Sequence, residues 1–559
     1  MPLLASMSFL PESLLKCEMP VNASIDLYTA MCEFDLLGLK FSKQWCSDML
    51  LACRDPLDEL PTSPDLKEAF GSELKVYLRA KSLFDLEEYE RVSFLLQDTT
   101  SKGCLLLNYY AQYLLLSKKS MMRSFEKVAS SMDSQYSKFI SLRNQLQKTL
   151  CDDDFYTCFI RACVARCLKL NKEAIEYFIK AVTFQPHLWS AWIELATLVS
   201  SRYQLKYLKL PNHWVRNLFF AHCLNELQCS EDALLIYDEL IKAKFEPTCS
   251  YIQEKRVSAL WNAKGSAGSE VAKEAYLNLR KTDPYNLDFI DQFSNLLFVI
   301  YDRPALSLLA QQCFAVNPYR HETCCVLGNY YSIIKEHCKA VHYYLQALKV
   351  NPYYVFAWTL AGHECMELKS YSSAVLAYRK AVELDSKEYR AWYGLGQTYE
   401  IMKMPKYALY YYMKAHEIRP LDARFLVALG DVYSKIGSNS DSRRCYWKAY
   451  CVGDCENIAL TRLATIYRIL GNDEAVVRIY LRYLEDVKSC VASSDQDEIC
   501  EALRYLGQYY ERHDDLTGLE AVLRWALDAT KYPNHSATIS PVISQLTAVT
   551  TNELRHVDS

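Results

Sequence analysis

The sequence predicts an all-α protein in which helical hairpins repeat and stack into a right-handed superhelical solenoid, and three observations support this. The 559 residues include only 15 glycines and 17 prolines, fewer than sheet-rich or disordered chains generally use for turns and linkers. Apolar residues make up 51% of the chain, enough for a continuous core. A pattern of small and aromatic residues also recurs every 34 residues, a period typical of helical-hairpin repeats.

The repeat is clearest between residues 318 and 453, where glycines follow one another at 34-residue intervals. Large residues precede each glycine by four positions, and small residues follow it by twelve, which is the tetratricopeptide pattern. We expect the small residues where helices approach most closely, because a larger side chain there would overpack the contact at about 1–3 kcal/mol. The residues assigned to repeat packing are Gly328, Gly362, Gly396, Gly430, Trp358, Trp392, Ala374 and Ala408.

Along the chain, we expect an N-terminal helical segment over residues 1–60 and divergent helical hairpins over 61–150. A first repeat block over 151–285 precedes a second block over 286–488. The polar segment 489–498 reads as a loop, because the next repeat follows 43 residues after the last one instead of 34. The final repeat and cap occupy 499–530, and residues 531–559 have no helical period, so they read as a flexible tail.

Charge and cysteine content argue against several classes of protein. Lysine and arginine total 63 and aspartate and glutamate 67, so the chain has no basic field to attract nucleic acid. No apolar run reaches the roughly eighteen residues of a membrane span, which predicts a soluble chain without a membrane partner. The 22 cysteines include no Cys-x-x-Cys motif, so we expect no metal site and read them as reduced thiols of the cytosol or nucleus.

Catalytic motifs are also missing from the sequence. The His363-Glu364 pair lacks the second histidine of a His-Glu-x-x-His zinc site, because residue 367 is glutamate. Gly394 and Gly396 lack the third glycine and the preceding strand of a dinucleotide-binding loop. We therefore predict no catalytic residue, no cofactor and no enzymatic activity.

A solenoid presents the first helices of successive repeats along its concave face, so we expect a peptide-binding groove there. In one interpretation the Asn329 amide binds peptide backbone and the Glu364 carboxylate pairs with a peptide arginine. In the other, both side chains are solvated or cap a neighbouring helix. The predicted groove residues are Asn329, His363, Glu364, Tyr393, Gln397, Glu400 and Asp431.

Three segments of the second block are more specific than the repeat pattern: ETCCVLGNYYS, RAWYGLGQTYE and KAYCVGD. With their surroundings they resemble the eighth-subunit family of the anaphase-promoting complex, strongly over residues 280–455 and more loosely elsewhere. The sequence departs locally from the repeat pattern at Cys365, where an aromatic residue is usual, and in the 489–498 insertion.

The resemblance implies a non-catalytic scaffold of a multisubunit ubiquitin ligase that supports mitotic progression and cyclin degradation. It also implies stacking on other repeat subunits, a homodimer through the N-terminal repeats, and binding of the C-box, a short motif of the coactivator, by the C-terminal repeats. The corresponding location is the nucleus and cytoplasm.

The alternative is a tetratricopeptide cochaperone or transport adaptor that binds peptide C-termini. Such carboxylate clamps place several lysines and arginines in one groove. The predicted groove offers chiefly Arg390 and Arg424 against several acidic residues, which disfavours this alternative.

Overall fold

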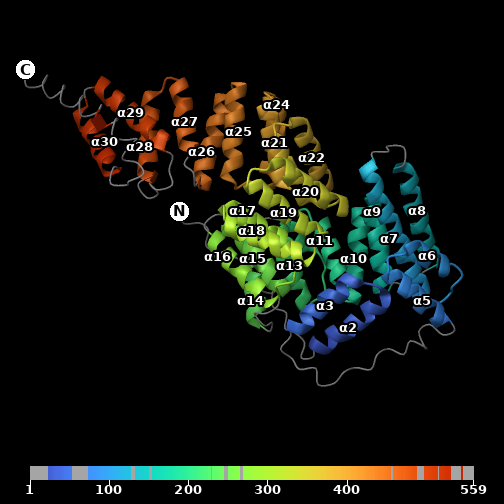
Figure 1. The fold of residues 1–559 in the computed structure, drawn as a ribbon. Coiled ribbons are helices and arrows are strands. Elements are labelled where there is room, and N and C mark those ends of the chain that lie inside the picture. Colours follow the sequence, from blue (N-terminus) through green and yellow to red (C-terminus); the bar gives the residue numbers. More distant parts are fainter. Residues whose placement is uncertain are drawn as a thin grey trace, which may run out of the picture. The chain divides into compact units, whose positions relative to one another are not determined.

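The computed structural model describes residues 23–52, 73–126, 132–149, 154–227, 229–243, 250–264, 268–454, 458–487, 496–513, 515–529 and 543–544. Its elements over these ranges are α-helices, which confirms the predicted all-α class (Figure 1). Across the same ranges, no helix combines the length and the apolar character that crossing a lipid bilayer demands. Most of the predicted tail and residues 489–495 of the predicted loop lie outside the described residues; α29 begins at Gln496, inside the predicted loop.

The chain forms two compact units, one of residues up to 334 with 349–353 and one of residues 335–348 with 354 onward. The first unit opens with helices in the predicted N-terminal segment and divergent hairpins, followed by the first repeats. Its helices are α2 (Ala23–Leu37), α3 (Lys40–Ala52), α5 (Leu74–Asp85), α6 (Tyr89–Leu95), α7 (Lys102–Glu126), α8 (Met132–Thr149), α9 (Phe155–Cys167), α10 (Asn171–Phe184), α11 (Trp189–Leu198), α12 (Arg202–Tyr207), α13 (Trp214–Glu226), α14 (Ser230–Ala243), α15 (Ser250–Lys264), α16 (Ser269–Thr282), α17 (Ile290–Ile300), α18 (Arg303–Val316) and α19 (His321–Ile333).

The second unit contains the most regular repeats. From residue 355 onward, each first helix packs on the helix that follows it, and each second helix packs on the first helix of the next repeat. The helices are α20 (His337–Val350, of which residues up to 348 belong to this unit), α21 (Val355–Glu367), α22 (Tyr371–Leu384), α23 (Tyr389–Ile401), α24 (Pro405–Ile418), α25 (Ala423–Ile436), α26 (Asn439–Val452), α27 (Ile458–Ile469), α28 (Asp473–Val487), α29 (Gln496–Arg512) and α30 (Leu516–Ala529).

The turn between the two helices of a repeat contains a residue in the left-handed conformation. Lys369, Lys403, Gly437 and Gly471 occupy this place in four successive repeats, with φ of 57°, 58°, 92° and 69°. At Lys403 the chain closes the helix end in a Schellman motif, because the Met404 amide donates to the Tyr399 carbonyl at 2.9 Å. The 34-residue period therefore extends to the backbone conformation of the turn.

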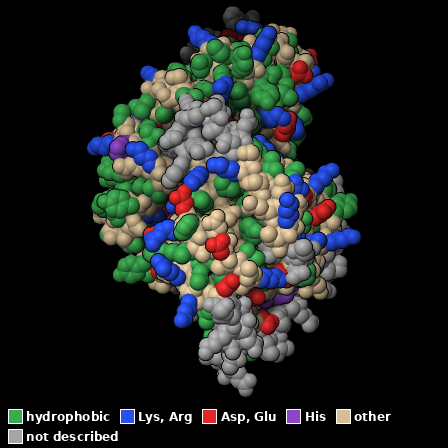
Figure 2. Space-filling model, turned by 90° about the vertical axis from the view of Figure 1, so that its right-hand side faces the viewer, with side chains coloured by type: hydrophobic (Ala, Val, Ile, Leu, Met, Phe, Trp, Pro, Cys, Tyr) green, Lys and Arg blue, Asp and Glu red, His purple; other side chains and the backbone are tan. Residues whose placement is uncertain are grey.

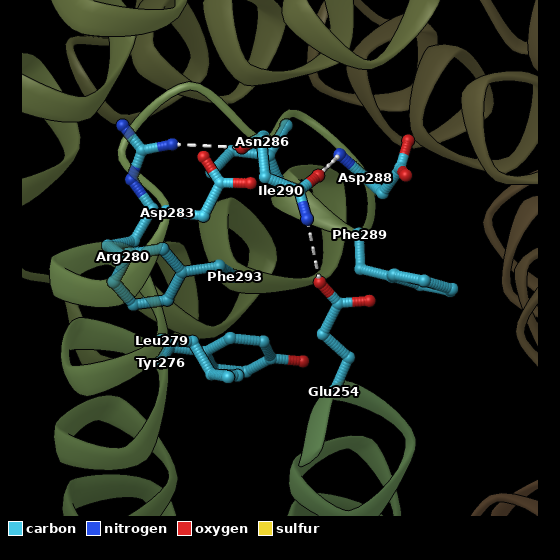
Figure 3. Close-up of a pocket in the computed structure, with 10 residues that line it drawn as sticks. All are labelled: Glu254, Tyr276, Leu279, Arg280, Asp283, Asn286, Asp288, Phe289, Ile290 and Phe293. Atoms are coloured by element: carbon cyan, nitrogen blue, oxygen red, sulfur yellow. Dashed lines mark hydrogen bonds between the residues drawn. The ribbon is translucent and has the colours of Figure 1, made fainter. Parts of the chain in front are cut away.

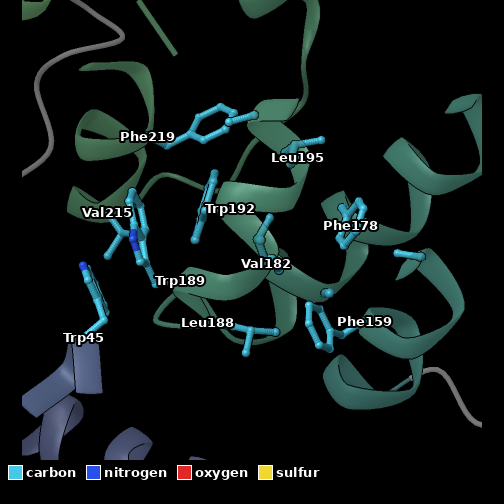
Figure 4. Packing of buried hydrophobic residues seen from close by; sticks show 14 of the residues in the cluster. Trp45, Phe159, Phe178, Val182, Leu188, Trp189, Trp192, Leu195, Val215 and Phe219 are labelled. Atoms are coloured by element: carbon cyan, nitrogen blue, oxygen red, sulfur yellow. The ribbon is translucent and has the colours of Figure 1, made fainter. Parts of the chain in front are cut away.

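The core of the first unit joins helices that are far apart in sequence. Trp45 of α3 stacks on Trp189 of α11, with ring centroids 5.1 Å apart (Figure 4). Its ring also stacks on that of Trp214 of α13, with centroids 6.0 Å apart. Tyr156 of α9 donates its hydroxyl to the Leu37 carbonyl at 2.7 Å. The N-terminal helices α2 and α3 are therefore part of this unit's packing.

The outer surface shows side chains of both charges scattered among apolar and other groups on the face drawn in Figure 2. This mixture agrees with the nearly balanced totals of basic and acidic residues.

Candidate functional site

The repeats of the second unit share a glycine–tyrosine contact that positions the candidate site. A Cβ placed on Gly362 would lie 2.5 Å from the ring of Tyr378. Gly396 has the same relation to Tyr412, and Gly430 to Tyr446, each at 2.4 Å. The glycine thus leaves space for an aromatic ring from the second helix of its own repeat, as the predicted packing role requires. Ala374 and Ala408 are fully buried, as predicted.

The hydroxyl of each of these tyrosines forms a hydrogen bond with a predicted groove residue on the first helix of the same repeat. The three contacts lie one repeat apart along α21, α23 and α25. They join Tyr378 to His363 Nδ1 at 2.7 Å, Tyr412 to Glu400 Oε2 at 2.8 Å, and Tyr446 to Asp431 Oδ1 at 2.5 Å. We call His363, Glu400 and Asp431 the tyrosine-anchored set.

The tyrosine-anchored set includes two carboxylates that solvent reaches. Glu400 and Asp431 keep 22% and 31% of their side chains exposed. Lys435 contacts Glu400, and Arg462 lies 3.9 Å from Asp431, so basic residues of neighbouring first helices partly balance both charges. Carboxylates that are fixed by a tyrosine and still accessible can accept hydrogen bonds from a cationic side chain of a ligand.

Burial changes the proton affinity of two members of the set. Desolvation, helped by the nearby Arg390 charge, lowers the pKa of His363 to about 4, so its imidazole is neutral at pH 7. Desolvation also raises the pKa of Asp431, against the opposing effect of the Tyr446 hydrogen bond. His363 therefore offers hydrogen bonds without adding positive charge to the surface.

An aromatic cluster lies beside these polar groups. The Tyr393 ring is 5.2 Å from that of Phe425 and 5.3 Å from that of Tyr412. Gln397 lies one turn further along α23, partly buried. The surface therefore combines apolar area for a peptide side chain with adjacent hydrogen-bonding groups.

Asn329 and Glu364 are placed differently from the rest of the predicted groove. Asn329 belongs to the first unit, is 2% exposed, and donates to the Ser294 hydroxyl at 2.8 Å. Glu364 is 6% exposed and lies 2.8 Å from His337 Nδ1. Neither side chain is solvated, because both make buried polar contacts within the chain. Their role in peptide binding stays a prediction.

Three further predicted packing residues have distinct environments. Trp358 and Trp392 are only partly buried, and Trp392 donates its indole N–H to the Ser386 carbonyl at 3.0 Å. Trp358 packs against the buried cluster of this unit, and the Trp392 ring lies 6.0 Å from that of Tyr411. Gly328 lies in α19 of the first unit, where it is buried.

The sequence interpretation missed the polar end of each buried tyrosine. Tyr378, Tyr412 and Tyr446 recur at 34-residue intervals and are buried. It also missed Lys435 and Arg462, the basic partners of Glu400 and Asp431. Tyrosine recurs at this position although phenylalanine would fill the same space, and this recurrence could have indicated that the hydroxyl makes a polar contact. Within the described ranges, no cluster of three or more histidine, cysteine or acidic residues is arranged to hold a metal ion.

Comparison with known proteins identifies the repeats and shows a family resemblance over part of the chain. Residues 24–257 match the family model of anaphase promoting complex subunit 8 / Cdc23, and residues 321–354 and 362–402 match tetratricopeptide repeat models. The cell division cycle protein 23 homolog of Bos taurus is 39% identical over 52% of this chain and 52% of its own length. Anaphase-promoting complex subunit 8 of Arabidopsis thaliana is 34% identical over 51% of this chain and 49% of its own.

A solved structure shows the same fold. The crystal structure of the APC/C hetero-tetramer Cut9-Hcn1 aligns with a TM-score of 0.50 and 14% identity, over 87% of this chain and 98% of that one. The chain spans about half the length of the curated relatives named above. On these matches, the chain is similar to the anaphase promoting complex subunit 8 / Cdc23 family over residues 24–257 and carries tetratricopeptide repeats.

Proposed function

We propose that this chain is a non-catalytic scaffold subunit of an anaphase-promoting complex, a ubiquitin ligase that supports mitotic progression and cyclin degradation. The match of residues 24–257 to the subunit 8 / Cdc23 family model and the tetratricopeptide fold support the proposal. Stacked helical hairpins present extended surfaces to several partners at once, which suits a scaffold. The proposed partners are other subunits of the complex and a second copy of this chain, bound through its N-terminal repeats. The proposed location is the nucleus and cytoplasm.

Within this role, we propose that the second unit binds the C-box of the coactivator on its first-helix surface. The observation that supports this most is the tyrosine-anchored set, in which Glu400 and Asp431 are oriented by tyrosine hydroxyls and remain accessible. An arginine of the peptide would bind one of these carboxylates in place of its present basic neighbour. Tyr393 and Phe425 would contact an apolar peptide side chain.

The peptide proposal is tested by fluorescence anisotropy of a labelled C-box peptide titrated with the full chain. Glu400→Gln and Asp431→Asn should each weaken binding about tenfold, because each removes one charge-assisted contact while preserving shape. The matched control is Glu383→Gln on α22, an exposed glutamate that forms an ion pair with neighbouring Lys380. Equal affinity for all four proteins would contradict the proposal.

Glu364→Lys is a poor test of the same idea, because Glu364 pairs with His337 in a buried site. Replacing it with lysine would leave a buried positive charge beside the histidine and would destabilise the repeat itself.

The alternative role as a cochaperone or adaptor is tested by the same anisotropy measurement with a different labelled peptide, one that ends in a free C-terminal carboxylate. Such a role predicts that this peptide binds, because Lys435 and Arg462 would attract its carboxylate.

A further inference from the structure

A separate pocket lies in the first unit, between α15, α16 and the start of α17 (Figure 3). Glu254 extends from α15, Tyr276 and Arg280 from α16, and Phe293 from α17. The connecting segment contributes Asp283 and Asn286. No member of the tyrosine-anchored set lines this pocket, and the C-box proposal does not involve it.

The Tyr276 hydroxyl is the first sign that the pocket accepts a ligand. Tyr276 is 4% exposed, and its buried hydroxyl has no hydrogen-bond partner. The ring stacks on Phe293, with centroids 5.0 Å apart, and the hydroxyl points toward the side of the pocket where Glu254 lies (Figure 3). A buried hydroxyl without a partner is unfavourable in the free protein, so a ligand that hydrogen-bonds to it would gain affinity.

The charges around the pocket indicate that this ligand is a cation. Glu254 is 9% exposed, and one of its carboxylate oxygens accepts from the Asn286 side-chain amide at 3.2 Å. Asp283 adds a second acidic group to the lining. Arg280 is already engaged, because its guanidinium donates to the Asn286 carbonyl and to Gln312, each at 3.1 Å.

Further charges from α15 itself and from neighbouring elements act on Glu254. Asp48 comes from α3, Asp288 from the connecting segment and Lys255 from α15. Arg320 pairs with Asp288, and the Lys255 ammonium lies over the Phe289 ring, 4.5 Å from its centroid. Burial, followed by the charges of Asp288, Asp48 and Asp283 and against that of Lys255, raises the pKa of Glu254 to about 8. The Glu254 carboxyl is thus short of compensating positive charge.

We propose that this pocket binds the guanidinium group of an arginine side chain supplied by a partner protein. The guanidinium would donate to Glu254 and to the Tyr276 oxygen and would lie against the aromatic rings. Arginine fits better than lysine because the acceptors lie on separate elements and the rings offer flat faces, which suit a planar group with several donors.

The test uses ligand-observed saturation-transfer NMR, which detects weak binding to a large protein, with the full chain and Nα-acetyl-arginine amide as the probe. Nα-acetyl-citrulline amide, which has the same shape without the charge, and Nα-acetyl-lysine amide serve as comparators. The expected result is the strongest binding for the arginine probe, weaker binding for lysine and none for citrulline. Binding of the arginine probe should tighten as pH rises from 6 to 9, because the cation favours ionised Glu254.

Two conservative variants locate the binding. Glu254→Gln should weaken the arginine probe about tenfold or more, and its amide oxygen can still accept the Asn286 bond. Tyr276→Phe should weaken the probe several-fold without lowering the melting temperature, because it removes a hydroxyl that has no partner. Tyr237→Phe is the matched control, since Tyr237 also has a buried hydroxyl without a partner but does not line the pocket.

No binding of the arginine probe, equal binding of citrulline or lysine, or equal binding to wild type and both pocket variants would overturn the proposal. Glu400→Gln separates this pocket from the C-box surface, because it should leave Glu254-dependent binding of the probe unchanged. Failure of the C-box proposal would therefore not affect the pocket result, and the reverse also holds.

Discussion

At the scale of single residues, the second unit depends on pairing a glycine with a tyrosine in each repeat. The glycine on the first helix leaves space for the tyrosine ring, and the tyrosine hydroxyl continues to a polar residue of that helix. One side chain thus packs the repeat and orients a group at its surface. A substitution at the glycine should therefore affect both stability and the peptide surface.

Gly396→Ala should destabilise the second unit by about 1–3 kcal/mol, because the added methyl group would meet the Tyr412 ring. Alanine's better helix propensity, about 0.5–1 kcal/mol, offsets only part of this cost. Urea denaturation measures the change. Combining Gly396→Ala with Tyr412→Leu should recover part of the loss, and strictly additive effects would contradict a direct contact.

A second prediction at this scale concerns the buried histidine His187. Burial, helped by His213, lowers its pKa to about 3, whereas an exposed histidine titrates near 6.5. Above pH 6.5 both the folded and the unfolded chain hold it neutral. As pH falls from 6.5 toward 3, the unfolded chain takes up the proton first, so folding stability is lost by on the order of 3–5 kcal/mol across the window.

His187→Gln should reduce this acid sensitivity, which denaturant melts at several pH values between 7 and 4 would measure. The slope of stability against pH is the relevant quantity, because the substitution can also change stability at pH 7. His342→Gln, at an exposed histidine, is the control. An unchanged slope in His187→Gln would show that His187 is not held neutral in the folded chain.

At the scale of elements, the hairpin turns repeat as strictly as the helices. Lys369 and Lys403 adopt the left-handed conformation that Gly437 and Gly471 adopt in the next two repeats. An L-residue with a side chain costs about 1–2 kcal/mol in that conformation, and glycine avoids this cost. The turns at Lys369 and Lys403 are therefore less stable than the same turns would be with glycine at these positions.

Lys403→Gly should stabilise the second unit by about 0.5–1 kcal/mol, after allowing for the greater flexibility of glycine in the unfolded chain. Gly437→Lys is the reciprocal change and should destabilise it by a similar amount. Urea midpoints of the two variants and the wild type measure both effects. Changes of the same sign would indicate that the turn conformation does not determine the outcome.

At the scale of the whole molecule, periodicity accounts for what the sequence could predict. The recurring small residues predicted the buried Ala374 and Ala408 and the tight glycine contacts. Periodicity does not show whether the polar end of a side chain is buried or exposed. It could therefore not distinguish the buried Glu364 from the accessible Glu400. The docking of Trp45 on α11 and α13 joins distant segments and leaves no local signal.

Local rules also failed where the repeat spacing is irregular or where an unusual residue occupies a repeat position. The segment between α11 and α13 contains the short helix α12, which the repeat pattern does not predict. The left-handed turns at lysines were not predicted, because a lysine in that position is indistinguishable in sequence from any exposed polar residue. The pocket at Glu254 depends on three elements whose meeting requires the fold itself.

The most direct test of the scaffold proposal is affinity purification of the tagged chain from dividing cells, followed by quantitative mass spectrometry under mild salt. We predict recovery of a cullin-like subunit, a RING subunit and other repeat subunits in nearly equal amounts with the chain. Recovery of the chain with only chaperones or vesicle components, in repeated preparations that retain its folded state, would contradict it.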